Sequence, residues 1–500
     1  MPQKIATLFF VLVIVGLYLL DWDRKRRTSL ALWIPVAWFS IAASRTPAQW
    51  LTMTGAANLT AAMTPEQIVD GSPFDRYFLT AIVALSVIVL LSRRGKVRTL
   101  LRANLPIVLF FLYCAISIIW SDYHVVALKR WIKAVGDVAM VLIVLSDDNP
   151  SAAVKRLLTR VGFLLVPASI LLANYYPVWG KAWGEWGGTG FYRGVATSKN
   201  ELGGVCLLFG VASVWRFCEA LRDRDMLHRL KDLMAESPIL GFVVWLLDKH
   251  RFRHLIAHGA LLAMVVFLFL KANVMTAMSC FVMASGLIVA THLRALALRP
   301  WVVRALAVLM IAVSVAALFF NVGGDLVETI GRDSTLTGRT ELWKHVLALS
   351  PNALLGTGFE NFWLPGRLDE LWSLYWWHPN EAHNGYIEVF INLGVVGLVM
   401  LGAVIVTSYR KIFAAVRRNP EEGGLWLAYF VVGLVYNFTE SAIRIMHPVW
   451  IFFLLAIMAA PEVPPSESMS LLAIQESNAF SRPEPQVEHA LCIQSRQGDA

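Results

Sequence analysis

The chain has 500 residues, of which 57% are hydrophobic and 16% are charged, and its formal net charge is +9. Soluble domains are about 45–50% apolar and about 25% charged, so this chain has too few charged side chains to cover a water-soluble body. The basic residues are spread between long apolar runs, which argues against a nucleic-acid-binding protein. The five cysteines show no metal-binding spacing. The composition therefore predicts an all-α polytopic integral membrane protein.

Thirteen apolar segments are candidates for membrane-spanning helices, because a helix needs roughly 20 mostly apolar residues to cross the hydrocarbon core. In chain order they are residues 5–20, 29–43, 77–92, 103–120, 131–146, 161–175, 201–215, 255–270, 274–291, 303–320, 385–408, 425–440 and 446–460. The segment 131–146 is the least typical because it contains Lys133 and Asp137, so we expect about 12–13 spans. The first segment lacks a small-residue cleavage site and is predicted to be a retained anchor.

The positions of Lys and Arg predict which loops face the cytoplasm. One alternate set of loops contains the main basic clusters, at residues 24–27, 93–102, 155–160, 216–253, 294–304 and 410–418. The positive-inside rule places this set in the cytoplasm and leaves the loops 44–76, 176–200 and 321–384 outside. Residues 1–100 then form N-terminal transmembrane helices and residues 101–460 a transmembrane core. The tail, 461–500, is rich in Pro, Ser, Glu and Gln and is expected to be a disordered cytoplasmic segment.

Basic residues in the outer loops call for a reason, because they run against the insertion bias. Arg193 and Lys199 lie in the loop 176–200, and Arg339 lies in the loop 321–384. Arg339 begins a stretch, GRTELWKHVLAL, whose apolar residues recur at helical spacing, as expected of an amphipathic helix on the membrane surface. Free N–H groups of the first turn and a guanidinium would then face the same anion. A solvated Arg, or one paired with lipid headgroups, is the alternative.

His383 lies just before the span 385–408 and is the obvious proton acceptor near neutral pH, although a lone histidine there can equally be structural. The outer loops are also rich in Trp and Tyr, which form either an interfacial belt or stacking faces for sugar rings. No metal site is expected, because His378 and His383 lack partnering ligands at a suitable spacing, and the pair Asp21 and Asp23 is interpreted as part of a solvated charge run. The absence of a GxxxxGK[ST] loop argues against an ATP-driven process.

The run from His383 to Leu398, HNGYIEVFINLGVVGL, resembles the signature of the O-antigen ligase and polymerase family, in which an HN pair closes the large periplasmic loop and a G-x-x-G helix follows. The segments GRTELW (338–343), GTGFENF (356–362) and RGVATSKNELG (193–203) resemble other parts of that family. The Lys-Asn pair at 199–200 is most similar to the exopolysaccharide-production polymerases within it. The resemblance covers roughly residues 100–460.

This resemblance implies a GT-C-like, metal-independent glycosyltransferase without a cofactor in the bacterial inner membrane. The donor would be a glycan on undecaprenyl diphosphate at the periplasmic face. The acceptor would be a hydroxyl on a second lipid-linked glycan for a polymerase, or on lipid A–core or a protein for a ligase. Chain-length regulator and flippase proteins are implied as partners, and nucleic acid is not. A glycan exporter or flippase is the alternative of a different class, but it predicts more ionisable residues deep inside the spans.

The resemblance also implies roles for particular residues. His383 would be the general base that takes the proton of the attacking hydroxyl. Cations would stabilise the diphosphate as it leaves, and the candidates are Arg193 and Arg339, with Lys199 as a secondary charge. Substrate positioning is implied for Asn200, Asn384 and Glu388. For Glu388 the alternatives are that it orients His383 or pairs with another residue within the bundle.

Overall fold

A computed structural model describes residues 2–22, 28–53, 72–183, 190–222, 249–297, 299–319 and 339–459. The tail 461–500 lies outside these residues. So does Arg332, which the sequence offers beside Arg339 as a candidate cation in the loop 321–384. The described part is built almost entirely of helices, so the all-α prediction is confirmed. Its strands, β1 (Lys181–Trp183) and β2 (Gly190–Tyr192), form one antiparallel hairpin in which Ala182 lies opposite Phe191.

The helices fall into two runs along the chain. The first run consists of α1 (Gln3–Leu20), η1 (Leu30–Leu32), α2 (Trp33–Ala42), α3 (Pro47–Met53), α5 (Pro73–Ser92), α6 (Arg94–Ala103), α7 (Leu105–Ile116), η2 (Ser117–Trp120), α8 (His124–Leu145), α9 (Pro150–Tyr175) and α10 (Pro177–Gly180). The second consists of α11 (Lys199–Arg222), α14 (Lys249–Ala272), α15 (Met275–His292), α16 (Arg294–Ala297), α17 (Pro300–Phe319), α19 (Arg339–Ala348), α20 (Arg367–Leu374), α21 (Gly385–Arg418), α22 (Pro420–Tyr436) and α23 (Pro448–Ala459).

Each of the thirteen predicted segments coincides largely with helix, and the polytopic membrane fold is confirmed. The number of full-length spans is smaller than predicted, however. Seven of the described helices are long and apolar enough to cross a membrane: α1, α5, α9, α11, α14, α15 and α21. The pair α6 and α7–η2, bent by 90°, would make an eighth. Shorter apolar helices account for three further segments, 30–42, 300–316 and 448–459.

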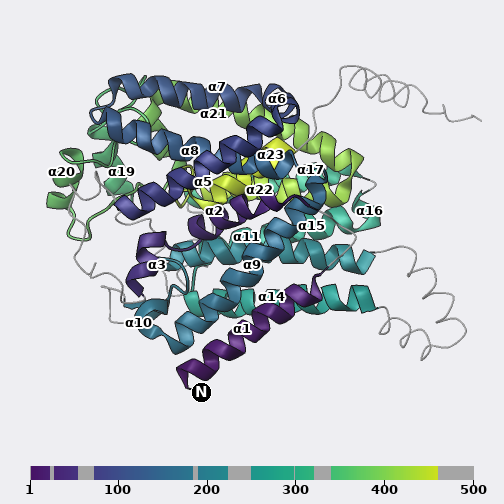
Figure 1. Cartoon of the computed structure of the whole chain (residues 1–500). Coiled ribbons are helices and arrows are strands. Elements are labelled where there is room, and N and C mark those ends of the chain that lie inside the picture. Colours follow the sequence, from purple (N-terminus) through teal and green to yellow (C-terminus); the bar gives the residue numbers. More distant parts are fainter. Residues whose placement is uncertain are drawn as a thin grey trace, which may run out of the picture. The chain divides into compact units, whose positions relative to one another are not determined.

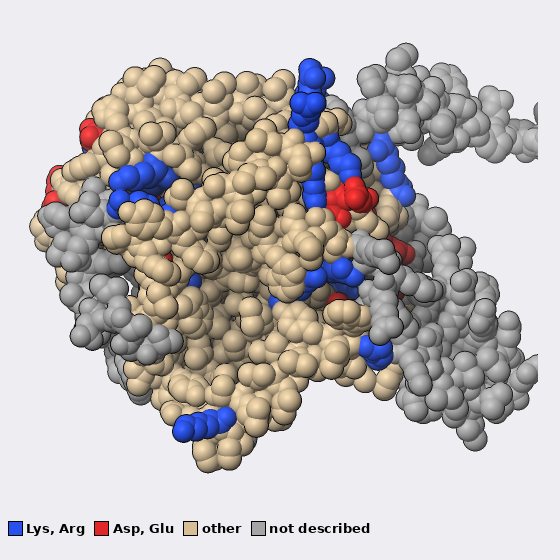
Figure 2. All heavy atoms as spheres, in the orientation of Figure 1, with Lys and Arg blue, Asp and Glu red and all other residues tan. Residues whose placement is uncertain are grey.

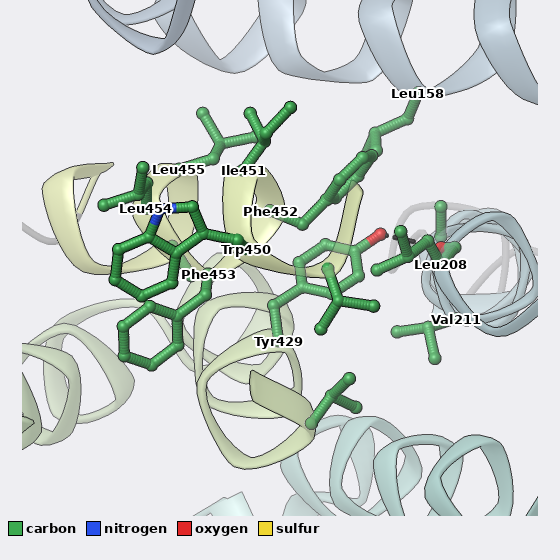
Figure 3. Close-up of a cluster of buried hydrophobic side chains, with 14 of the residues drawn as sticks. Leu158, Leu208, Val211, Tyr429, Trp450, Ile451, Phe452, Phe453, Leu454 and Leu455 are labelled. Carbon is green, nitrogen blue, oxygen red and sulfur yellow. Dashed lines mark hydrogen bonds between the residues drawn. The ribbon is translucent and has the colours of Figure 1, made fainter. Parts of the chain in front are cut away.

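Helix α23 is a short apolar helix that is surrounded by protein and not by lipid. All residues from Pro448 to Met458 are buried in protein, so the helix is apolar all round. Figure 3 shows the core around it, where the rings of Phe452 and Tyr429 meet edge to face at 5.1 Å. The Tyr429 hydroxyl donates a hydrogen bond of 2.9 Å to the carbonyl of Leu208 on α11, which satisfies the only polar atom of that buried side chain.

The connections between helices gather at two ends of the bundle. Figure 1 shows α19, α20 and α10 at the left-hand end and α6 and α16 at the right-hand end. The left-hand end therefore carries parts of both loops, 176–200 and 321–384, that the sequence places on one face. Figure 2 shows Lys and Arg side chains over α6 at the right-hand end, although others lie at the left. Which end of the bundle faces the cytoplasm stays a prediction.

Helix α21 is interrupted at Gly394, where φ is 66° and ψ is −166°. A Cβ atom at this position would lie 2.1 Å from the carbonyl oxygen of Leu354, so only glycine fits. The N–H of Val395 donates instead to the carbonyl of Ala353, at 2.9 Å. On the other side of the break, the N–H of Thr357 donates to the carbonyl of Ile391, at 3.0 Å. The outer loop is thus hydrogen-bonded directly onto the broken helix.

Candidate functional site

His383 lies on the short connection between α20 and α21, in a left-handed backbone conformation with φ of 51°. Its Nδ1 atom lies 3.0 Å from Oε1 of Glu381 and 3.6 Å from Oε2 of Glu440. Glu440 belongs to the non-helical segment 437–447 between α22 and α23. The imidazole is therefore held between two carboxylates, and with 23% of its side chain exposed it can still be reached from outside.

The two carboxylates change the acid–base properties of the ring. Burial alone would lower the pKa of His383, but the interactions with Glu381 and Glu440 outweigh it and raise the pKa to about 9. At neutral pH the ring is therefore an imidazolium. Burial likewise raises the pKa of Glu381, but Arg444 and His383 lower it to about 2, so this carboxylate stays ionised.

Glu440 also joins two residues from distant parts of the chain. Arg339, the first residue of α19, donates through Nη1 to the carbonyl of Thr439 at 2.6 Å, and its Nη2 lies 3.9 Å from Glu440 Oε1. The side-chain amide of Asn200, in the first turn of α11, donates to both oxygens of Glu440 at 3.3 Å. We call Asn200, Arg339, Glu381, His383 and Glu440 the His383 cluster. It brings together three sequence-predicted residues from the two outer loops.

Glu381 connects this cluster to Arg444 of the segment 437–447. Its Oε1 faces His383, and its Oε2 accepts a hydrogen bond of 2.7 Å from Nη1 of Arg444. The other terminal nitrogen of Arg444 lies 4.0 Å from Oε1 of Glu201. Arg444 is thus paired with Glu381, on the connection before α21, and with Glu201, in the first turn of α11, and it fixes the position of Glu381 against the histidine.

Asn384 and Glu388 stabilise the surrounding backbone and do not touch the imidazole in this structure. Asn384 caps α21 by accepting hydrogen bonds from the N–H groups of Tyr386 and Ile387, at 3.0 and 3.1 Å. Its Nδ2 donates to the carbonyl of Phe438 at 3.1 Å. Glu388 accepts a hydrogen bond of 2.6 Å from the N–H of Ala382. Both side chains therefore fix the peptide segment that carries His383.

Arg193 and Lys199 contact other parts of the loop 176–200. Arg193 donates through Nε to the carbonyl of Trp179 at 2.9 Å and through Nη2 to that of Val178 at 3.1 Å, which closes the loop around the β-hairpin. The ammonium of Lys199 lies 5.5 Å from the ring centroid of Phe191. Their predicted role at the diphosphate remains a prediction.

Two groups among the described residues present three potential metal ligands within 4.8 Å of one another, namely Glu381, His383 and Glu440, and Asp21, His254 and His258. The sequence spacing could not indicate the first group, because Glu440 lies far along the chain from His383. The guanidiniums of Arg339 and Arg444 approach its two carboxylates. These ion pairs compete with metal binding, and the predicted metal independence stays a prediction.

The second group corrects an expectation about Asp21, which does not belong to a solvated charge run. Its Oδ1 lies 2.7 Å from Nδ1 of His254, 3.3 Å from Nε2 of His258 and 3.2 Å from Nη2 of Arg216. Burial would raise the pKa of Asp21, but hydrogen bonds from the two histidines and the charge of Arg216 hold it well below its usual range. The sequence did not reveal this arrangement because its partners lie on α11 and α14.

The helical bundle and the His383 cluster define a polytopic membrane protein with a polar site formed by its outer loops. Residues 259–402, which include Arg339 and His383, match the family model described as O-antigen ligase. This part of the chain is therefore similar to the O-antigen ligase family, as the sequence motifs predict.

A curated relative is the exopolysaccharide production protein ExoQ of Rhizobium meliloti (strain 1021), to which the chain is 33% identical over 119 residues. The aligned part covers 22% of this chain and only 27% of the relative's length. The predicted similarity to exopolysaccharide-production proteins is thus confirmed for this part of the chain.

Proposed function

We propose that the protein is a membrane glycosyltransferase that moves a glycan from undecaprenyl diphosphate to an acceptor hydroxyl on the periplasmic face of the inner membrane, and that it polymerises exopolysaccharide repeat units. The observation that carries the proposal is the His383 cluster. There the imidazole of His383 and the guanidinium of Arg339, both within the family-matched residues, meet Glu440 of the segment 437–447 and the amide of Asn200 from the loop 176–200.

In the proposed reaction, the acceptor oxygen forms a bond to the anomeric carbon of the donor sugar. The bond from that carbon to the diphosphate oxygen breaks, and the diphosphate leaves with the electron pair. The hydroxyl proton passes to His383. Because Nδ1 faces Glu381 and Glu440, it keeps its hydrogen, and Nε2 is the nitrogen that accepts the new proton. The reactive form is therefore the neutral imidazole.

Cations are assigned to the leaving group in this proposal. The guanidinium of Arg339 uses one N–H for the carbonyl of Thr439 and retains further donors for phosphate oxygens. Its position beside Glu440 places it within the same cluster as the base. Arg193 and Lys199 are proposed to bind the diphosphate as secondary cations, and Asn200 to position the substrate. The proposed mechanism assigns no step to a metal ion.

The nearest alternative is ligation of a finished glycan to lipid A–core or to a protein, which the description of the matched family model favours. Similarity to an exopolysaccharide production protein favours polymerisation. An exporter or flippase is disfavoured because Asp137, an acidic residue of α8, is engaged in the fold: it accepts hydrogen bonds from Trp38 Nε1 at 2.8 Å and from the N–H of Met446 at 2.9 Å.

The test is an analysis of glycans and lipid-linked intermediates in a strain that lacks the gene. We expect single repeat units to accumulate on the lipid carrier while lipid A–core is unchanged. Accumulation of free lipid-linked polymer would identify a ligase instead. Accumulation of units on the cytoplasmic leaflet would indicate a flippase, and unchanged polysaccharide and intermediates would contradict the proposed activity.

A further inference from the structure

A cavity of about 580 Å³ adjoins the His383 cluster. Its walls come from α8, α11, α20 and α21, from the segment that follows α20, and from residues 443–448. This volume falls within the range of about 300–1,000 Å³ that is usual for small-molecule sites. Arg193, Lys199 and Arg339, the proposed diphosphate ligands, do not belong to its lining. The cavity is therefore a separate space from the one assigned to the leaving group.

The cavity meets the cluster at Glu381. Oε1 of Glu381 contacts His383, whereas Oε2 is bound by Arg444, and both Glu381 and Arg444 line the cavity. Arg339 approaches the cluster at Glu440 instead. A molecule in the cavity would therefore lie on the Glu381 side of the cluster, while the diphosphate would lie on the Glu440 side. In a transfer reaction these are the places of the acceptor and of the donor.

The lining combines indole rings with carboxyl groups. Trp363 and Trp372 are both partly exposed, and each uses its indole N–H within the protein, Trp363 for Glu388 at 2.9 Å and Trp372 for the carbonyl of Pro379 at 2.9 Å. The polar edges of the rings are thus satisfied. One face of Trp372 stacks on the ring of His378, with 4.8 Å between centroids, and the exposed remainder of the two indole rings offers apolar surface. Carboxylates act only as acceptors and suit hydroxyl donors. Apolar faces beside hydroxyl acceptors match the alternating C–H and O–H surfaces of a sugar ring.

The charge of the lining argues against an acidic ligand. Carboxyl groups of Glu201, Glu360, Glu381 and Glu388 face the cavity, against the guanidiniums of Arg130 and Arg444. His447 adds no positive charge, because burial and the neighbouring Arg444 lower its pKa to about 3. An anionic group inside the cavity would meet an excess of carboxylates, each of which repels it.

Backbone strain is concentrated around this cavity. Five non-glycine residues in the described part of the chain have positive φ, and three of them, Glu360, His378 and Met446, line the cavity. A fourth, His383, contacts Glu381 in its wall. Such conformations are unfavourable and persist where the surrounding structure holds them in place, as it does at binding sites.

From the cavity, its two Trp rings and its carboxylate-rich wall, we propose that it binds sugar rings of the acceptor glycan and that the rings it admits carry no acidic group. This inference rests on the proposed transferase function, of which it specifies the acceptor. Trp372 and Trp363 are the stacking residues, and Glu360 is a selecting residue that excludes anionic sugars.

Direct binding tests this proposal without requiring transfer activity. The purified full-length protein is titrated calorimetrically with neutral tetrasaccharides of glucose, galactose or mannose, and with tetragalacturonate. We expect at least one neutral tetrasaccharide to bind, and tetragalacturonate to bind at least about tenfold more weakly, which corresponds to one modest charge repulsion. Equal or tighter binding of tetragalacturonate, or no binding of any neutral tetrasaccharide, would overturn the proposal.

Two matched pairs of variants locate the binding. Trp372→Ala is expected to weaken binding of the neutral sugar by about tenfold, whereas Trp376→Ala, at a 60%-exposed side chain outside the lining, leaves it unchanged. Glu360→Gln is expected to reduce the difference in affinity between neutral and acidic tetrasaccharides. Glu370→Gln, on the exposed side of α20, is expected to leave that difference unchanged. If both variants of a pair changed sugar binding equally, the sugar would not bind in this cavity. The purified protein could bind neutral sugars selectively while deletion of its gene leaves the polysaccharide unchanged. That combination would refute the proposed transferase function but retain the sugar-binding site.

Discussion

Two clusters of histidine and carboxylate side chains occur along α11, about 24 Å apart by the rise of that helix. The His383 cluster includes Asn200 at its start, and the second cluster, which we call the Asp21 cluster, includes Arg216 near its end together with Asp21, His254 and His258. The side chains of the Asp21 cluster come from α11, α14 and the residue that ends α1. Those of the His383 cluster come largely from non-helical segments that carry positive φ.

The same chemical groups therefore have different consequences in the two places. In the Asp21 cluster the ion pairs connect α1, α11 and α14 and are enclosed by them, as expected of a structural element. In the His383 cluster the imidazole is partly exposed, its backbone is strained and a cavity adjoins it. Access and strain, more than composition, distinguish a candidate active site from a polar contact between helices. The four predictions below test this distinction.

The largest effect is expected for His383→Ala. Loss of the base should reduce glycan transfer by about 10²–10⁴-fold, while membrane insertion and elution in size-exclusion chromatography stay unchanged. Transfer is measured with lipid-linked repeat units as substrate. His254→Ala, which removes a histidine of the Asp21 cluster, should retain activity within about threefold. Normal long-chain polysaccharide from the His383 variant would remove the base assignment.

The pH dependence should follow the raised pKa of His383. Because the imidazole must be neutral to accept a proton and its pKa is about 9, kcat/KM should rise with pH up to that value. The expected slope is about tenfold per pH unit well below the pKa, and the total rise between pH 7 and pH 9 is about 50-fold, because half of the imidazole is neutral at its pKa. Rates at several pH values under subsaturating substrate provide the measurement. A profile that is flat over this interval would assign the base to one of the carboxylates.

Arg339→Lys should reduce transfer by about tenfold or more, because a point charge cannot replace a guanidinium that binds a backbone carbonyl and an anion together. The control is Arg367→Lys, since Arg367 pairs with Asp122 at 2.6 Å, outside the His383 cluster. Full activity of the Arg339 variant would show that charge alone suffices at this position.

Asp21→Asn should affect stability more than activity. Removing one partner of a buried ion pair costs about 3–5 kcal/mol, so the midpoint of thermal unfolding should fall while the transfer rate stays within about threefold. Unfolding is followed by intrinsic fluorescence of the solubilised protein. A large loss of activity in protein of wild-type stability would mean that the Asp21 cluster also acts in function.

The sequence predicts the helices well, because long apolar runs are a local signal. It also identifies His383, Arg339 and Asn200, which the structure brings to one carboxylate. That carboxylate, Glu440, was assigned to the end of a predicted span, since the apolar run 425–440 gives no sign that α22 ends at Tyr436. Only the fold reveals that the segment 437–447 returns to the outer loops.

Other residues of the site show a second limit of sequence patterns. Glu381 stands between Asn380 and Ala382 without a motif that marks it, and Arg444 acquires its role only by pairing with it across the fold. Asn384 and Glu388 belong to the family-like segment, yet in the structure their hydrogen bonds hold the backbone. A sequence motif locates the region of the site, and the three-dimensional contacts show which role each residue has within that region.

The break at Gly394 has a consequence for depth in the membrane. Beyond the break, the apolar part of α21 runs only from Val395 to Tyr409, because a basic cluster begins at Arg410. These roughly 15 residues extend for about 22 Å, which is less than the hydrocarbon core of about 30 Å. We therefore expect part of the segment 385–393, which carries Glu388 and Asn392 of the cavity wall, to lie within the hydrocarbon layer as well.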